Sequence, residues 1–222
     1  MHREVYLLQV KRSLVELALF EKQVRALQQE FPKNSDLPDL LLAAAKAHLA
    51  NNHVDKAAAL AKEVIAARPD DDESARSILK RIDLLGKPLP IKFKAVDGRE
   101  VDLEKMRGQV VLVDFWATWC TICIVELPKV KATYHKLHPR GFEIVGISLD
   151  EDKADLDKLL KQQKLPWPQY FDGKGLENKL AQEFIVTGLP LMLLVDKKGN
   201  VRDLNAREDL ADKVERLLKE PR

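Results

Sequence analysis

The chain of 222 residues carries 37 lysine and arginine residues against 35 aspartate and glutamate residues, and 45% of its residues are hydrophobic. A chain of this length buries either one large core or two small ones. The net charge of only +2 gives no electrostatic footprint for nucleic-acid binding, so we expect no nucleic-acid partner. No apolar run in the sequence approaches the ~20 residues of a membrane-spanning helix.

The N-terminal stretch MHREVYLLQVKRSLVELALFEK is interrupted by charged residues every few positions. It therefore lacks the apolar core and the small-residue cleavage site of a secretory signal. We expect the protein either to stay inside the cell or to be a mature form from which a signal has been removed.

Helical spacing of apolar residues predicts four helices in the first part of the chain. Prolines, an asparagine pair or a glycine stand at or directly after their predicted ends, where helices commonly stop. Asp70, Asp71 and Asp72 lie at the predicted start of the fourth helix, where negative charge suits the helix dipole. The predicted ranges are 3–31, 37–51, 54–68 and 71–85.

The middle two helices resemble a tetratricopeptide-type hairpin. If Pro69 is the terminal proline of the repeat, Ala45 and Ala57 fall where the motif requires small residues for close helix contact. An ordinary antiparallel helix bundle explains the same alanine-rich pattern, so both interpretations stay open. We expect residues 1–86 to form a helical segment separate from residues 87–222.

After Gly86 the pattern changes to short strands that alternate with helices. KPLPIKF has extended character, a hairpin is predicted around Asp97-Gly98, and VVLVDF (110–115) is a continuous apolar run typical of a strand buried on both faces. Further strands are predicted over 141–150, 169–171, 191–196 and around Val201, and helices over 121–137, 152–164, 176–184 and 208–219. This alternation predicts an α/β protein with a central sheet flanked by helices.

The two cysteines of the chain, Cys120 and Cys123, stand three positions apart where the predicted helix 121–137 begins. One CxxC unit supplies only part of a structural zinc site, and no second unit is present, so we set a metal site aside. A pair of inert buried cysteines would need no special position, yet this pair stands at a strand-to-helix junction.

Thiol–disulfide exchange is the interpretation that uses this position. Backbone N–H groups at a helix N-terminus stabilise a thiolate, which is the form that attacks disulfides. We expect Cys120 to be accessible at the helix end and to act as the nucleophile. Cys123, one turn further, is expected to be buried and to resolve the mixed disulfide.

The motif VDFWATWCTIC, followed by Pro128, by GLP at 188–190 and by LLVDKKGNV, is similar to the thioredoxin superfamily. Within it, GKPLPIKFKAVDGREVDLEKMRGQVVLVDFWATWC, ELP and GISLDED resemble the TlpA-like/ResA-like branch of thiol–disulfide oxidoreductases. The resemblance extends over residues 86–220. It implies a thioredoxin-like fold, a central mixed sheet flanked by helices, preceded by a small all-α segment.

The resemblance also implies roles for two acids near the cysteines. Asp114 matches the buried acid behind the cysteines of thioredoxins, which makes it the expected general base for Cys123. Burial in a strand would raise the pKa of this carboxyl, which suits proton exchange near neutral pH. Glu126 stands where the branch often has glutamate and is expected to tune the same proton transfer.

Three further residues are expected to bind substrate on the same grounds. Trp119 matches the tryptophan that flanks the nucleophile. Pro190 matches the cis-proline that lies opposite the disulfide in the family. The backbone just before that proline pairs with the substrate chain in the family, which assigns Leu189 to the binding surface.

The sequence departs from the family pattern at two places. Thr121-Ile122 stand between the cysteines, where proline or glycine is usual, and no histidine there adds a cation that would lower the pKa of the Cys120 thiol. This departure predicts a weak to moderate reductant rather than a strong oxidant. Leu191 follows Pro190 where threonine is usual, which leaves the substrate preference open.

We expect protein disulfides as substrates, an upstream thiol reductant as electron donor and no bound cofactor, because the cysteines themselves carry the electrons. The branch works outside the cytoplasm, so the resemblance implies a periplasmic or envelope location for a mature form, and a cytoplasmic one otherwise. The helical segment is a candidate for binding a protein partner.

Two other functions remain open at this point. One is a thioredoxin-fold peroxidase, for which Thr118 stands two positions before Cys120 but no arginine lies close in sequence. The other is a protein-interaction module in which the redox activity is secondary.

Overall fold

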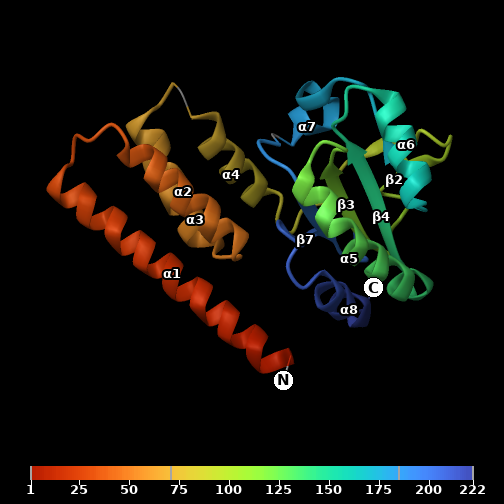
Figure 1. Ribbon diagram of the computed structural model, residues 1–222, viewed down its shortest axis with the longest axis horizontal. Helices are drawn as coiled ribbons and strands as arrows, with labels where there is room; N and C mark the ends of the chain where they lie inside the picture. Colours follow the sequence, from red (N-terminus) through yellow and green to blue (C-terminus); the bar gives the residue numbers. More distant parts are fainter. Residues whose placement is uncertain (1, 71, 185, 222) are drawn as a thin grey trace. The chain divides into compact units, whose positions relative to one another are not determined.

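The computed structural model describes the backbone of residues 2–70, 72–184 and 186–221, and within these ranges the side chains from residue 16 onward. The chain divides into two compact units, one up to Ile82 and one from Asp83 onward (Figure 1). Each unit buries apolar side chains of its own. Within the described residues, no helix is both long enough and apolar enough to cross a membrane.

The first unit is built from four helices, the last of which ends at the division between the units. α2 packs against both α1 and α3. Ala44 and Ala45 of α2 and Ala57 and Ala61 of α3 are fully buried, as expected where small side chains allow helices to approach closely. The helices are α1 (His2–Glu30), α2 (Leu37–Ala50), α3 (Val54–Ala67) and α4 (Glu73–Asp83).

Local side chains account for the helix ends in this unit. The Asn51 side-chain amide donates to the Ala47 carbonyl at 2.8 Å, and Asn52 adopts a left-handed backbone with φ 57°, which asparagine tolerates better than most residues. At the start of α4, the Asp72 carboxylate accepts the Ala75 N–H at 3.1 Å and so caps the helix. Asp71 lies outside the described residues.

The second unit contains a five-stranded mixed sheet in the order β5-β4-β3-β6-β7. β3 pairs in parallel with β4, and β4 with β5, whereas β6 is antiparallel to both β3 and β7. The strands are β3 (Val110–Trp116), β4 (Phe142–Ser148), β5 (Gln169–Tyr170), β6 (Leu191–Val195) and β7 (Val201–Asp203). The expected hairpin forms a separate small sheet of β1 (Lys92–Lys94) and β2 (Glu100–Asp102).

Helices cover both faces of the large sheet. On one face, Leu112 of β3 shares a buried cluster with Val130 of α5 (Thr121–Leu137) and Val214 of α8 (Leu210–Lys219), and α6 (Lys153–Gln163) packs Leu159 against it. On the other face, the Phe115 and Phe184 rings meet at a centroid distance of 6.0 Å. Burial on both sides explains why β3 is a continuous apolar run.

The helix predicted over 176–184 is wrong in its extent. The structure has a short 3₁₀ helix at Gly175–Glu177 and then α7 (Lys179–Glu183). Asn178 separates them, because its side-chain oxygen accepts the N–H groups of Leu180 and Ala181 at 3.0 and 3.1 Å. An asparagine that caps a helix start in this way interrupts the helical spacing on which the prediction relied.

Candidate functional site

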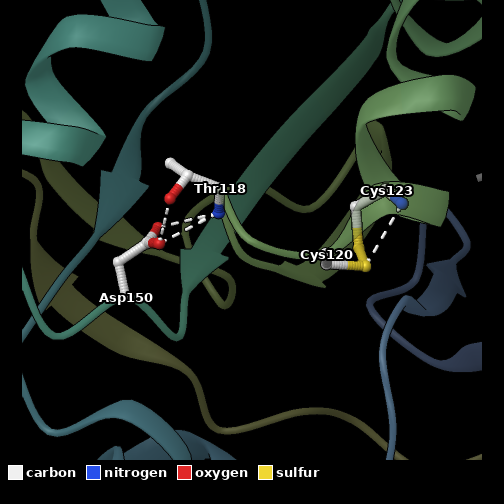
Figure 2. The surroundings of a disulfide bond; sticks show 4 residues. All are labelled: Thr118, Cys120, Cys123 and Asp150. Carbon is white, nitrogen blue, oxygen red and sulfur yellow. Dashed lines mark hydrogen bonds between the residues drawn. A yellow bond between two sulfur atoms is a disulfide. The ribbon is translucent and has the colours of Figure 1, made fainter.

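The cysteine pair lies at the junction where β3 leads into α5. Cys120 is the N-cap residue of α5, and its Sγ accepts the backbone N–H of Cys123 at 3.2 Å. The two residues form a disulfide with their Cα atoms 5.2 Å apart, and Figure 2 shows this bond at the first turn of the helix. A sulfur held at a helix N-terminus by an N–H donor is stabilised as a thiolate once the disulfide is reduced.

The two cysteines differ less in exposure than the sequence predicted. Cys120 was expected to be accessible, but it is only 7% exposed, against 5% for Cys123. The disulfide contributes to this, because each sulfur covers part of the other. In the disulfide form, access to the pair therefore depends on the side chains around it.

Those surrounding side chains are unusually apolar and exposed. Trp119 is 57% exposed, Ile122 51% and Val125 72%. Ile122 and Val125 are three positions apart on α5 and so share a helix face. Of these three residues, only Trp119 was expected from the sequence to bind substrate. Two apolar residues at this spacing, off the face of α5 that carries the buried Cys123 and Leu127, were the signal that could have found the other two.

The loop before Cys120 is held by a buried carboxylate that the sequence analysis also missed. Asp150, which follows β4 and is almost fully buried, accepts the backbone N–H of Thr118 at 2.9 Å and its hydroxyl at 2.6 Å (Figure 2). The Ser148 hydroxyl donates to the other oxygen of the same carboxylate at 2.7 Å. Asp150 thus holds the turn at Thr118 that places Cys120 at the start of α5.

Asp114 lies on the face of the sheet that α5 covers. Side chains alternate along a strand, and Asp114 has the same parity as Val110 and Leu112, which pack into the cluster beneath α5. It is 5% exposed, and burial raises the pKa of its carboxyl to about 7. The group can therefore both accept and release a proton near neutral pH.

The remaining predicted site residues lie on two segments. Glu126 is half-buried in α5, three positions after Cys123. Leu189 and Pro190 are half-buried before β6 and are joined by a cis peptide bond. Leu191 of β6 pairs with Phe115 of β3, so this segment enters the sheet beside the end of β3 from which the cysteine loop leaves.

Comparison with known proteins supports the same chemistry. The model of the AhpC/TSA family matches residues 85–204. The chain belongs to the AhpC/TSA family. It is 32% identical over 136 residues to a thiol-disulfide oxidoreductase ResA of Bacillus cereus, in an alignment that covers 60% of this chain and 76% of that relative.

Solved structures agree with this relationship. The thioredoxin domain of a thiol-disulfide oxidoreductase from Bacteroides vulgatus is 31% identical, with a TM-score of 0.55 over 61% of this chain and 98% of that one. A putative thiol:disulfide interchange protein DsbE from Chlorobium tepidum is 27% identical, with a TM-score of 0.52 over 60% of this chain and 97% of that one. The thioredoxin-like fold predicted for the second unit is thereby confirmed.

This AhpC/TSA family member is a protein thiol–disulfide oxidoreductase, with Cys120 and Cys123 as its CxxC pair. Thr118, which suggested a peroxidase, uses its hydroxyl to hold Asp150 instead. The family match begins at residue 85, so the tetratricopeptide-like character of the first unit stays a prediction. Among the described residues, no group of three or more histidine, cysteine, aspartate or glutamate side chains is arranged to hold a metal ion.

Proposed function

We propose that this oxidoreductase works as a reductant of protein disulfides. The observation that carries the proposal is that the exposed residues beside the cysteine pair, Thr121, Ile122 and Val125, include no cation. A cation there would stabilise the Cys120 thiolate, and with it the reduced form, which makes a protein oxidising. Without that cation the disulfide form is favoured, so the dithiol gives up its electrons readily.

Cys120 is the proposed nucleophile, since the Cys123 N–H that its sulfur accepts favours its thiolate. The thiolate attacks one sulfur of the substrate disulfide, forms a mixed disulfide and releases the other substrate sulfur as a thiol after it takes up a proton. Cys123 then loses its proton and attacks the Cys120 sulfur. The Cys120–Cys123 disulfide forms, the second substrate thiol leaves, and two electrons have passed to the substrate.

Asp114 is the proposed acceptor of the Cys123 proton. Its position on the α5 face of the sheet and the pKa of about 7 that burial produces both suit this role. Glu126, three positions further along the helix that starts with the cysteines, is proposed to assist the same transfer.

The substrate is proposed to be an extended chain with apolar residues beside its disulfide. Trp119, Ile122 and Val125 offer the exposed apolar surface for it. Leu189 and Pro190, beside the end of β3, are proposed to meet the backbone of the same chain.

We also propose an extracytoplasmic location and an upstream thiol reductant, on the strength of the resemblance to the TlpA-like/ResA-like branch. Cell fractionation tests the location, and recovery of the protein in the cytoplasm with both cysteines reduced would contradict it.

The reduction potential of the pair, measured by thiol trapping in defined dithiol buffers, tests the direction of electron flow. We expect a value near or below about −230 mV, whereas a value near about −120 mV would make the protein a disulfide donor. Ile122→His is the matched variant, because it adds the missing cation between the cysteines. It should raise the potential by about 30 mV or more, while Val125→Thr, which adds no charge, should leave it close to that of the wild type.

A further inference from the structure

One row of residues runs across the sheet through Asp114. Asp114 of β3 pairs with Gly146 of β4, and Gly146 pairs with Gln169 of β5. Neighbours in such a row point to the same face of a sheet. The side chains of Asp114 and Gln169 therefore lie on one face, with only a glycine between them.

The Gln169 side chain occupies the space above that glycine. A Cβ added at Gly146 would meet the Gln169 amide, with Cδ at 2.6 Å and Nε2 at 2.7 Å. Contacts this close do not occur with a real side chain, so an alanine at this position would displace the amide. Gly146 thus allows Gln169 to extend across β4 toward β3, the strand that carries Asp114.

A hydrogen bond from Trp116 identifies the oxygen end of the Gln169 side-chain amide. The Trp116 indole Nε1–H, which can only donate, donates to Gln169 Oε1 at 2.9 Å. The other end of the amide, the Nε2 donor, takes no part in this hydrogen bond. Gln169 is only 2% exposed. Neither Nε2 of Gln169 nor Oδ1 of Asp114 has a hydrogen-bond partner among the described residues, and buried polar groups left in this state are costly.

We propose that Gln169 is a positioning residue for Asp114, and that its amide N–H donates to the Asp114 carboxylate across Gly146 through one water molecule. The inference rests on the proposed role of Asp114 as the proton acceptor. A donor to the charged form stabilises the carboxylate, so Gln169 keeps Asp114 acidic enough to be ionised when Cys123 must lose its proton. The Trp116 indole holds the amide in the required orientation.

The two strands that pair with β3 carry few ionisable side chains. β6 carries no ionisable side chain, and its residue in the row is Met192. Glu143 is the only ionisable residue of β4 and pairs with Val111 at the other end of β3. In α5, which covers this face, the ionisable groups nearest the helix start are Cys123 and Glu126.

The test is a direct titration of the Asp114 carboxyl by ¹³C NMR in the disulfide form, where neither cysteine titrates, with Asp114→Asn to assign the signal. In Gln169→Met, which keeps the length of the side chain but loses the donor, Asp114 should become about tenfold weaker as an acid. Gly146→Ala, which keeps the amide but displaces it, should shift the titration in the same direction.

Val145→Ala is the control for general loosening of the fold, because Val145 is buried on the opposite face of β4. It should leave the Asp114 titration unchanged. If Gln169→Met and Gly146→Ala also leave it unchanged, the inference is overturned.

The pH dependence of exchange in the same variants separates this inference from the proposed function. In a plot of exchange rate against pH, the acidic limb should shift together with the pKa of Asp114. If the carboxyl shifts and the rate profile does not, Gln169 acts on Asp114 as inferred, but Asp114 is not the proton acceptor.

Discussion

The carboxyl of Asp114 shows how burial sets the chemistry of a single residue. Desolvation penalises its charged form and raises its pKa from 3.8 to about 7. The unfolded chain ionises this group above about pH 4, whereas the folded chain keeps it protonated until about pH 7. The folded state therefore loses stability as the pH rises through this window, and the loss is complete above it.

Asp114→Asn should consequently stabilise the oxidised protein at pH 7.5, because the amide carries no charge that burial penalises. The gain in the free energy of unfolding should be on the order of 3 kcal/mol at pH 7.5 and near zero at about pH 4. Urea unfolding of wild type and variant at the two pH values measures it. A gain of the same size at both would show that the carboxyl is not held in its protonated form by burial.

At the scale of the element, the turn between β3 and α5 depends on a side chain from another strand. Asp150 follows β4, yet it accepts both the backbone N–H and the hydroxyl of Thr118. Parallel pairing of β3 with β4 places the ends of the two strands together, with Trp116 opposite Ser148. The turn that positions Cys120 is therefore held across the strand pair, in addition to its own local bonds.

Asp150→Ala should lower the free energy of unfolding by about 2 kcal/mol, because it leaves the buried Ser148 hydroxyl and the partly buried donors of Thr118 without an acceptor. It should also slow disulfide exchange, since Cys120 is no longer held at the helix start. Thr118→Val is the matched variant, which removes one hydroxyl but keeps the backbone N–H bond, and it should cost about half as much. Chemical denaturation and a disulfide-reduction assay measure both. Equal effects of the two variants would argue against Asp150 as the anchor of the turn.

Most elements could be predicted from the sequence, because apolar spacing and helix-ending residues act locally. The prediction of one helix over 176–184 was wrong for a local reason too. Asn178 caps the start of α7 with its side chain, so the 3₁₀ helix before it does not continue into α7. The roles of Asp150 and Gln169 could not be predicted in the same way. Each acts on a residue of another strand, and the spacing of apolar residues does not indicate which strands pair.

At the scale of the whole molecule, the chain divides into its two units between Ile82 and Asp83. The sequence pattern changes four residues later, after Gly86. The second unit begins at Asp83, and the residues that follow are tied to β7. The Gly86 N–H donates to the Val201 carbonyl and the Val201 N–H to the Lys87 carbonyl, each at 2.9 Å. The segment just before Lys87 therefore belongs to the thioredoxin-like unit.

A fragment beginning at Asp83 should fold cooperatively and reduce protein disulfides at a rate close to that of the full chain. One beginning at Lys87 should be less stable by about 1 kcal/mol, because the hydrogen bond from Gly86 is lost. Thermal unfolding and insulin reduction compare the two fragments with the full chain. Loss of activity in both, with the fold intact, would instead assign the first unit a part in substrate capture.

The sequence by itself determined the α/β class, the order of the elements and the position of a reactive cysteine pair at a helix start. These features depend on residue spacing over one or a few turns, which local physics translates directly into structure. Asp114 and Pro190 came from resemblance to a family rather than from spacing.

Only the tertiary structure decided which side chains share the site and how exposed they are. Trp116 and Gln169 are 53 positions apart, yet they form a buried hydrogen bond, and the cysteine expected to be accessible proved to be nearly covered. Strand pairing and packing bring such residues together. The energies of their hydrogen bonds and of ionisation depend on burial, which the local sequence pattern does not indicate. The proton chemistry of Asp114 is for this reason a property of the fold rather than of the motif.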